Sequence, residues 1–338
     1  MLIVGIPDKA LGEHERRWLA EPQVSGVILF ARNFEDRAQI MALIDSIRDL
    51  RPGPFLVCVD QEGGPVQRLR KGFTSLPALS TLGRLHDRDA ARAVAMAEEH
   101  AWLMASEMRA IDIDLSFAPV VDLARGNRAI DERALHADPA VVSELALAYL
   151  RGMHLGGMAA TLKHFPGHGS VVEDTHFEIA HDPRSLDEIR RTDLVPFADA
   201  IGAGAEAVML AHVIYPAVDS QPAGCSAIWI RQLLRGEFGF AGTVISDDIG
   251  MAAARPLGNV TERVALHLAA GCDLILACDP AIVPEALATT SGATPCEPER
   301  LARLRGNAAQ SWDALVDNPQ RDHFIARVMT LDQLAQAG

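Results

Sequence analysis

Short apolar runs rich in β-branched residues recur along the chain, and segments with helical periodicity separate most of them. Runs that are apolar on both faces are typical of strands buried in a parallel sheet. We therefore predict strands at Leu2–Ile6, Gly26–Phe30, Phe55–Asp60, Ile113–Ala118, Ala159–His164, Ala207–His212, Thr243–Asp247 and Leu274–Cys278.

Between these runs, apolar residues recur with the spacing of one face of an amphipathic helix. One predicted helix ends before Pro52-Gly53, and its apolar face consists of Ile40, Ile44, Ile47 and Leu50. Ser185 and Glu188 form a capping box at the start of another helix, which we expect to continue to Ile201.

The alternation of strands with helices favours a closed parallel sheet, the (β/α)8 barrel, as a single domain over residues 1–338. An open, doubly wound sheet is the alternative, but no Gly-x-Gly-x-x-Gly motif follows the first strand. We expect residues 280–298 to form a loop and residues 323–337 to form a C-terminal helix that covers the barrel.

The composition is typical of a globular protein. Apolar residues make up 49% and charged residues 22% of the 338 positions, and the net charge is −14. This charge argues against nucleic acid or an anionic membrane as a partner. The N-terminus has no basic lead, and the five scattered cysteines contain no Cys-x-x-Cys pair. We therefore expect a cytoplasmic protein with reduced cysteines. For the oligomeric state, which the sequence does not reveal, a monomer is the default expectation.

Polar residues close several predicted strands, and in a (β/α)8 barrel the chemistry takes place at this end. Lys163 and His164 end one strand, and both can hold the hydroxyl groups of a substrate. Asp247 and Asp248 end another strand. Since neighbouring strand residues point to opposite sides, one carboxylate should face the substrate and the other should bond the wall or cap a helix. A carboxylate nucleophile suits glycosyl transfer, because negative charge stabilises an oxocarbenium-like transition state.

Asp60 ends the third predicted strand and can accept hydrogen bonds from vicinal sugar hydroxyls, while Arg68 supplies a rigid set of donors. Gly63-Gly64 between them permits a tight turn. A structural ion pair is the alternative for Asp60 and Arg68. Arg133 lies in a segment with three arginines, residues 125–135, which we name the arginine loop; a solvated charge is its default interpretation.

Asp174 and His176 lie in a predicted loop that follows Lys163-His164. An aspartate two residues from a histidine can fix the tautomer of the ring and raise its basicity. Gly167 and Gly169 permit positive φ angles, so we predict a mobile catalytic loop over about residues 165–178, the lid loop, that brings a proton-transfer group over a bound sugar. An ordinary surface pair is the alternative for Asp174 and His176.

Three other functions are open for the same residues. Lys163 could form a Schiff base, although nothing near it in the sequence explains a lowered pKa. His164, His168 and Asp247 could belong to a metal-dependent hydrolase, although the histidine spacing matches no common metal motif. A protein that binds sugar without turnover is the third alternative.

Taken together, these segments resemble glycoside hydrolase family 3, specifically its single-domain bacterial β-N-acetylhexosaminidases. The resemblance extends from Gly26 to about Asp279 and depends on Asp60-Gln-Glu-Gly-Gly, Lys163-His-Phe-Pro-Gly-His-Gly, Asp174-Thr-His176 and Ser246-Asp-Asp-Ile-Gly-Met. It implies a retaining exo-β-N-acetylglucosaminidase that needs no metal or other cofactor. Its substrate would be a muropeptide fragment, from which it would release terminal β-1,4-linked N-acetylglucosamine during cytoplasmic peptidoglycan recycling and cell-wall biogenesis.

The resemblance also implies roles for individual residues. Asp247 would be the nucleophile that forms a covalent glycosyl–enzyme intermediate, and His176 would be the acid/base with Asp174 as its partner. The residues that hold the N-acetylglucosamine unit would be Asp60, Arg68, Arg133, Lys163 and His164.

The chain departs from the family pattern in the arginine loop. Asp131 stands in place of a glycine, and Leu135 stands in place of an aromatic residue. Arg133 is kept, but these two changes leave the conformation of the loop, and so the contact of Arg133, open.

Overall fold

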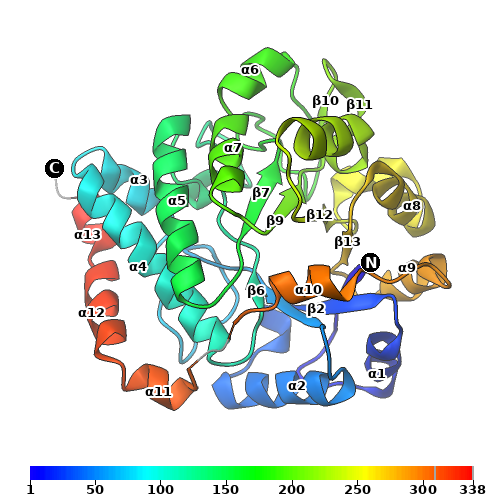
Figure 1. Cartoon of the computed structure of the whole chain (residues 1–338), viewed down its shortest axis with the longest axis horizontal. Coiled ribbons are helices and arrows are strands. Elements are labelled where there is room, and N and C mark those ends of the chain that lie inside the picture. Colours follow the sequence, from blue (N-terminus) through cyan, green and yellow to red (C-terminus); the bar gives the residue numbers. More distant parts are fainter. Residues whose placement is uncertain (308–309, 337–338) are drawn as a thin grey trace.

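The apolar runs form strands of one parallel sheet in the computed structural model, which describes residues 1–307 and 310–336 (Figure 1). Within those residues the sheet has eight strands in the order β6-β3-β2-β1-β13-β12-β9-β7. Their bounds are β1 Leu2–Gly5, β2 Val24–Leu29, β3 Leu56–Val59, β6 Leu115–Ser116, β7 Thr161–Phe165, β9 Ala207–Leu210, β12 Thr243–Asp248 and β13 Leu274–Ala277. Each predicted strand overlaps one of these, so the strand prediction is confirmed.

The two edges of this sheet meet between the segment after β6 and strand β7. The amide of Thr161 donates to the carbonyl of Ala118 (2.8 Å), and the amide of Val121 donates to the carbonyl of Lys163 (2.9 Å). Val120 and Lys163 form a parallel bridge. These contacts close the sheet into a barrel, which confirms the (β/α)8 fold and makes the open-sheet alternative wrong.

The helices surround this barrel (Figure 1). They are α1 Glu13–Ala20, α2 Arg37–Leu50, α3 Ser80–His86, α4 Ala90–Arg109, α5 Pro139–Leu155, α6 Leu186–Arg191, α7 Leu194–Gly202, a π-helix Ile228–Glu237, α8 Val260–Ala270, α9 Val283–Thr290, α10 Pro298–Leu304, α11 Trp312–Val316, α12 Pro319–Val328 and α13 Leu331–Gln336. The helix predicted from the spacing of isoleucines is α2, and it ends before Pro52-Gly53 as expected.

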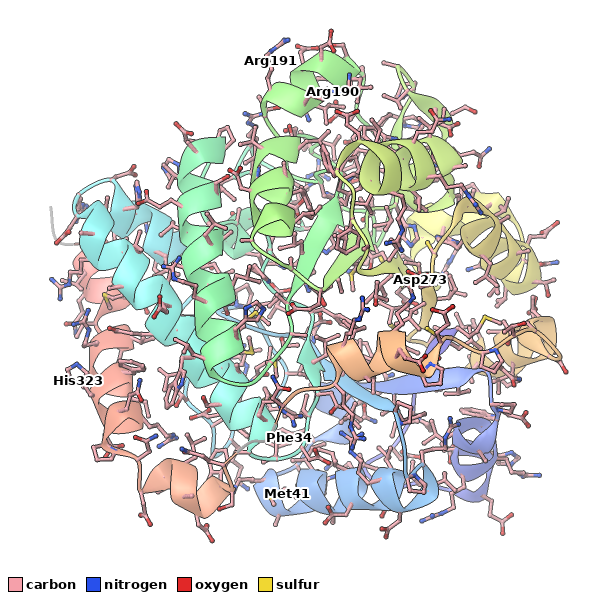
Figure 2. All side chains as sticks on the ribbon, in the orientation of Figure 1. Phe34, Met41, Arg190, Arg191, Asp273 and His323 are labelled. Carbon is pink, nitrogen blue, oxygen red and sulfur yellow. The ribbon has the colours of Figure 1, made fainter. Side chains whose placement is uncertain are left out.

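One end of the barrel is filled. Strand residues such as Ile3 and Ile245 form an interior cluster, and Leu301 and Leu304 of α10 join it. The carboxylate of Asp273 forms an ion pair with Arg300 of α10 (3.4 Å) and so helps to hold this helix across the barrel end (Figure 2). The opposite end, where the strands finish, is therefore the end that can hold a site.

Two small sheets lie near the carboxyl ends of the strands and were not predicted. The hairpin of β4 Gln61–Gly63 and β5 Val66–Gln67 turns at Gly63-Gly64, where both residues have positive φ (106° and 54°). The second sheet consists of β8 Ala180–His181, β10 Val213–Tyr215 and β11 Asp219–Pro222. Strands this short give too little alternation to be recognised in a sequence.

The helix capped by Ser185 is shorter than predicted. The capping box is present, but α6 ends at Arg191 and α7 begins separately at Leu194. Between them, the buried carboxylate of Asp193 accepts from Arg184 (2.7 Å), and the hydroxyl of Thr192 donates to the carbonyl of Glu188 (2.7 Å). Because these side chains bond locally between the two helices, the single continuous helix that we predicted to Ile201 does not form.

Two predictions near the C-terminus also differ from the structure. Residues 280–298 are not a loop throughout, because α9 forms over Val283–Thr290 with a buried face against the barrel. The single helix expected over residues 323–337 corresponds to two helices, α12 and α13; Ala337 lies outside the described residues. In the part of the chain that the structure describes, no helix has both the length and the apolar character needed to cross a bilayer.

Candidate active site

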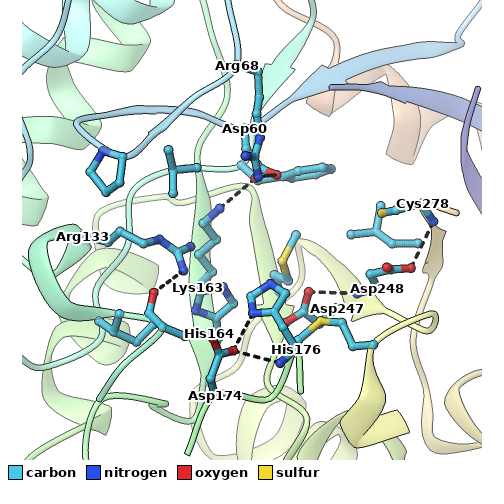
Figure 3. A pocket seen from close by; sticks show the side chains of 18 of the residues that line it. Asp60, Arg68, Arg133, Lys163, His164, Asp174, His176, Asp247, Asp248 and Cys278 are labelled. Carbon is cyan, nitrogen blue, oxygen red and sulfur yellow. Dashed lines mark hydrogen bonds and ion pairs between the residues drawn. The ribbon is translucent and has the colours of Figure 1, made fainter. Parts of the chain in front are cut away.

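A cavity of about 500 Å³ lies at the carboxyl ends of the strands (Figure 3). Every residue predicted for substrate binding or catalysis lines this one cavity, although these residues come from loops far apart in the sequence. They are Asp60, Arg68, Arg133, Lys163, His164, Asp174, His176 and Asp247. The barrel therefore gathers the predicted residues in one place.

One side of the cavity is a group of paired charges that we name the charge cage: Asp60, Glu62, Lys163 and Arg133. The ammonium of Lys163 contacts Asp60 Oδ1 (2.9 Å) and Glu62 Oε1 (2.6 Å). Arg133 binds Glu62 through Nε and Nη2, each at 2.9 Å. The side chains of Lys163 and Glu62 are only 2% and 1% exposed. Such buried charges are stable only because each is paired.

The charge cage fixes the ionisation of Glu62. Burial alone would favour the neutral acid, but the charges of Arg133 and Lys163 outweigh it and hold the pKa of Glu62 well below its usual range. The same pair raises the pKa of Arg133, although its burial acts in the opposite direction. Glu62 therefore stays a carboxylate that fixes the directions of two cations toward the cavity.

Arg68 approaches the cage from the hairpin that follows β3. Its Nη2 lies 3.6 Å from Asp60 Oδ2, and its guanidinium lies over the ring of Phe30 (5.7 Å to the centroid). The predicted turn at Gly63-Gly64 brings Arg68 back beside Asp60. Asp60 is thus placed between two cations at the border of the cavity.

In the arginine loop, the aspartate that stands in place of a glycine has a backbone conformation that glycine favours. Asp131 has a φ of 34°, in the left-handed region that aspartate tolerates better than most residues. A short helical turn, Asp131–Arg133, follows and brings Arg133 to Glu62 and the cavity. Arg133 is thus held at the cavity by Glu62, and its contact with a sugar stays a prediction.

His164 is held from behind by Asp122. Its Nδ1 lies 2.7 Å from Asp122 Oδ2, and the amide of His168 donates to Asp122 Oδ1 (2.6 Å). Burial opposes ionisation of Asp122, but the charge of His164 and its hydrogen bond prevail and lower the pKa of this carboxyl. Because Nδ1 is engaged, Nε2 is the nitrogen of His164 that is left for a ligand.

His168 lies deeper, where burial lowers its pKa to about 4 although the charge of Asp122 acts to raise it. The ring is therefore neutral at neutral pH, and its Nε2 lies 2.8 Å from the hydroxyl of Thr175 in the lid loop. Among residues 1–307 and 310–336, no group of three or more His, Cys, Asp or Glu side chains is arranged to hold a metal ion.

Asp247 and Asp248 both border the cavity, but their carboxylates have different partners (Figure 3). Asp248 Oδ1 accepts from the amides of Gly250 and Cys278, each at 3.0 Å, so this carboxylate is bound to the barrel wall. Asp247 Oδ1 accepts only the amide of Asp248 (2.8 Å) among the hydrogen bonds seen in the described residues. The expectation that one of the two would bond the wall agrees with these contacts.

The pKa values of the two carboxylates are also shifted in opposite directions. Burial raises the pKa of Asp248, and two backbone amides offset that only in part. Burial also disfavours the charged form of Asp247, but the charges of His164, His212 and His176 lower its pKa below the ordinary value. Asp247 is therefore an ionised carboxylate that faces the cavity near three histidines, as a nucleophile requires.

Asp174 and His176 occupy the rim of the cavity (Figure 3). The ring Nδ1 of His176 lies 2.7 Å from Asp174 Oδ1, and the same oxygen accepts the backbone amide of His176 (2.9 Å). Partial burial acts to raise the pKa of Asp174, but the hydrogen bonds from His176 outweigh it, so this pKa is lowered. The His176 side chain is 54% exposed. An ionised aspartate thus fixes an imidazole whose Nε2 is free to exchange protons.

The glycines of the lid loop have different reasons to be glycine. Gly167 has a φ of 135°, as predicted. Gly169 does not have a positive φ; instead, a Cβ at this position would overlap the carbonyl oxygen of Leu123. The prediction of a positive φ is thus wrong for Gly169, which permits close packing of the loop against the barrel.

Two acidic residues beside the cavity were given no role from the sequence, although Asp122 is one of the polar residues that follow a predicted strand. Glu62 connects Lys163 to Arg133, and Asp122 orients His164. Glu62 stands inside the Asp60-Gln-Glu-Gly-Gly string, and Asp122 follows a predicted strand end, so both had the same signal as residues that were selected. What the sequence could not supply is the pairing, which depends on β7 lying close to β4, to the arginine loop and to the segment after β6.

Comparisons with known proteins agree with this geometry. Residues 2–318 match the family described as Glycosyl hydrolase family 3 N terminal domain. A Beta-hexosaminidase of Stenotrophomonas maltophilia (strain R551-3) is 55% identical over 316 residues, which cover 94% of each chain. A Beta-hexosaminidase of Xylella fastidiosa (strain M23) is 53% identical over 316 residues, again 94% of each chain. The crystal structure of NagZ from Neisseria gonorrhoeae in complex with N-trifluoroacetyl-D-glucosamine is similar with a TM-score of 0.91 and 39% identity, covering 98% of this chain and 97% of that one.

Proposed function

The chain belongs to glycosyl hydrolase family 3, and on that basis we propose that it is a retaining exo-β-N-acetylglucosaminidase. Its substrate would be a muropeptide fragment, from which it releases terminal β-1,4-linked N-acetylglucosamine in the cytoplasm during cell-wall recycling. The observation that carries the proposal is that Asp247 and the Asp174–His176 pair border the same cavity, with the charge cage beside them.

In the proposed first step, a carboxylate oxygen of Asp247 attacks the anomeric carbon of the bound sugar. The bond from that carbon to the leaving oxygen breaks, and the imidazolium of His176 gives its proton to this oxygen through Nε2. Asp174 stabilises the imidazolium and fixes the ring tautomer through the 2.7 Å bond to Nδ1. The lowered pKa of Asp247 supports this role, because an ionised carboxylate is needed for attack.

In the second step, neutral His176 takes a proton from water, and the water oxygen attacks the anomeric carbon. The bond to Asp247 breaks, which restores the carboxylate and the imidazolium. Two displacements at one carbon return the original configuration, so the product is the β-anomer. No metal or other cofactor takes part in either step as proposed.

The charge cage is proposed to hold the hydroxyl groups of the terminal sugar. In the cage, Asp60 offers acceptor oxygens, while Lys163 and Arg133 offer donors at fixed angles; Arg68 adds donors from beside the cage. His164 adds its free Nε2. Because these groups are already paired and oriented, binding a sugar requires little reorganisation of charge. The barrel core closes the lower end of the cavity. Such a cavity can take the end of a glycan chain but lets no chain pass through, which supports exo action.

The choice of N-acetylglucosamine is supported by the names of the relatives and by the sugar in the gonococcal complex. The muropeptide, the cytoplasmic location and the monomeric state are proposed from the resemblance, from the reduced cysteines and from the absence of any sequence feature that calls for a partner. We likewise propose that neither nucleic acid nor a membrane is involved.

The test is the stereochemistry and metal dependence of hydrolysis. We expect proton NMR to show the β-anomer of N-acetylglucosamine first when purified enzyme cleaves a β-1,4-linked N-acetylglucosaminyl muropeptide, with activity unchanged by a chelator. The α-anomer as first product would exclude the double displacement. Loss of activity on chelation would support the metal-dependent alternative, and absence of turnover on any N-acetyl-β-glucosaminide would leave only sugar binding.

A further inference from the structure

Asn127 is a buried residue of the arginine loop that uses all of its side-chain hydrogen-bonding capacity. Its Nδ2 donates to the carbonyls of Val171 (2.8 Å) and Glu173 (2.9 Å) in the lid loop. Its Oδ1 accepts from the amides of Ala129 (2.8 Å) and Ile130 (2.9 Å) in its own loop. A primary amide has two donors and two lone pairs, so the side chain, in a residue 2% exposed, is fully satisfied.

On the side of the lid loop, these bonds end next to the proposed proton-transfer pair. Glu173 directly precedes Asp174, whose carboxylate accepts the amide of His176 (2.9 Å). The turn is held from its other side by the backbone of Ala252, whose amide donates to the carbonyl of His176 (3.3 Å). Asn127 is therefore the side chain that fixes the upstream end of the turn that presents His176.

On the side of the arginine loop, the same side chain starts the turn that presents Arg133. The oxygen of Asn127 holds the amides of residues 129 and 130. Arg133 then donates from its backbone amide to the carbonyl of Ile130 (2.7 Å) and from Nη1 to the carbonyl of Ala129 (3.0 Å). From this turn the guanidinium reaches Glu62 in the charge cage.

We infer that Asn127 is a positioning residue that locks the lid loop to the arginine loop, so that His176 and Arg133 act on the same bound sugar. The inference rests on the proposed acid/base role of His176 and goes beyond it by assigning what sets the position of that ring. The exposed pair of Arg128 and Glu178 (3.2 Å; 65% and 46% exposed) also connects the loops, but water screens it. The two bonds of the buried amide (2.8 and 2.9 Å) are also shorter than the other bonds between these loops, from Arg128 N to Val172 O (3.3 Å) and from Arg125 Nη1 to Ser170 Oγ (3.4 Å).

The most selective variant is Asn127→Asp. It keeps an oxygen for the amides of Ala129 and Ile130, but replaces the donors to the lid loop by an oxygen that faces two carbonyls. Kinetics with aryl N-acetyl-β-glucosaminides of graded leaving-group pKa measure the effect. We expect kcat/KM for the poorest leaving group to fall at least about 10-fold further than for the best, within the about 10²–10⁴-fold that acid catalysis supplies.

A second variant covers the case in which a buried carboxyl prevents folding. Asn127→Ser has no charge, and its short hydroxyl can still accept from the local turn but cannot reach the lid loop. We expect the same steeper dependence on the leaving group. Asn33→Asp is the matched control, since Asn33 is equally buried and its amide donates to the carbonyls of Ile6 (3.0 Å) and Asp8 (2.9 Å), away from the lid loop. It should lower stability without changing that dependence.

Three outcomes separate this inference from the proposed function. A steeper dependence in Asn127→Asp or Asn127→Ser and in His176→Ala supports both. A steeper dependence in His176→Ala alone, with uniform losses in both Asn127 variants as in Asn33→Asp, overturns the positioning role and leaves the proposed function intact. If His176→Ala itself loses activity uniformly, the acid/base role fails and the inference fails with it.

Discussion

The charge cage and the Asp174–His176 pair border one cavity, yet they are built in opposite ways. Lys163 and Glu62 are almost wholly inaccessible to solvent and are paired in several directions. His176 is more than half exposed and is held by one carboxylate in a loop without regular structure. In the proposed mechanism, recognition would thus depend on groups fixed by the barrel, and proton transfer would depend on a group at the rim.

This difference has a chemical reason. Groups that bind hydroxyls keep the same charge throughout a reaction, so a buried, fully paired arrangement costs nothing during turnover. A proton-transfer group must change charge twice and must exchange its proton with water. A ring at the rim, steadied by Asp174, meets both needs. The comparison predicts that substitutions in the two regions will differ in their effects on activity and on unfolding stability.

The largest effect of a change at the rim is expected from His176→Ala. With a poor leaving group, kcat should fall by about 10²–10⁴-fold, because protonation of the departing oxygen is lost. With an activated aryl leaving group the loss should be far smaller. The melting temperature should stay within experimental error of the wild type, since the side chain is exposed. Equal losses with both substrates would contradict the assignment of an acid.

The corresponding change in the charge cage is Glu62→Gln. Removing one partner of a buried ion pair leaves Lys163 and Arg133 short of negative charge, and we expect about 3–5 kcal/mol less stability in denaturant unfolding. Activity should fall by a similar factor for good and poor leaving groups, because binding rather than protonation is damaged.

The matched control for Glu62→Gln is Glu35→Gln. Glu35 also pairs with a lysine, Lys9, at 2.9 Å, but both side chains are largely exposed (61% and 47%). Glu35→Gln should lower the free energy of unfolding by at most about 1 kcal/mol. Equal effects of the two substitutions would show that burial does not distinguish the charge cage from an ordinary surface pair.

A smaller, pH-dependent effect separates the two regions further. The pKa of Glu62 is lower in the folded protein than in the unfolded chain, so its contribution to stability is complete above about pH 5 and is lost as the pH falls toward the lowered pKa. The difference in unfolding free energy between wild type and Glu62→Gln should therefore shrink from pH 7 to pH 3.

Asp174→Asn offers the comparison at the rim. The pKa of Asp174 is also lowered, so the sign of the pH dependence is the same, but water reaches this carboxylate and the difference should be smaller at every pH. Urea unfolding curves of the wild type, Glu62→Gln and Asp174→Asn at several pH values would measure these differences in unfolding free energy. A Glu62→Gln difference that is constant or grows toward acid pH would be inconsistent with a paired, buried carboxylate.

The contrast between the regions also shows how much could be predicted from sequence. Strands and their polar ends were predictable, because short apolar, β-branched runs such as Thr243–Asp247 are typical of buried parallel strands and strand ends face the site in a barrel. Asp60, Lys163 and Asp247 followed from that. The family resemblance added roles for His176 and Arg133 that spacing alone left open.

What could not be predicted depends on contacts between distant segments. Glu62 of β4 could not be matched to Lys163 and Arg133 before β4, β7 and the arginine loop were placed together. Asn127 gave no signal, because its partners are backbone carbonyls and amides, which are the same at every position. The helix α9 was missed because eight residues give only two turns, too few for a clear apolar periodicity, even though a proline in its first turn is compatible with a helix start.

The central claim is that Asp247, and not a residue of the charge cage or its neighbour Asp248, forms a bond to the sugar. Mass spectrometry after incubation with a fluorinated, slowly hydrolysed N-acetylglucosamine substrate tests it directly. We expect one added glycosyl group, located by peptide mapping at Asp247 and absent from Asp247→Asn. A label on Asp248, Asp60 or Glu62, or steady turnover of the slow substrate with no labelled protein, would contradict the account.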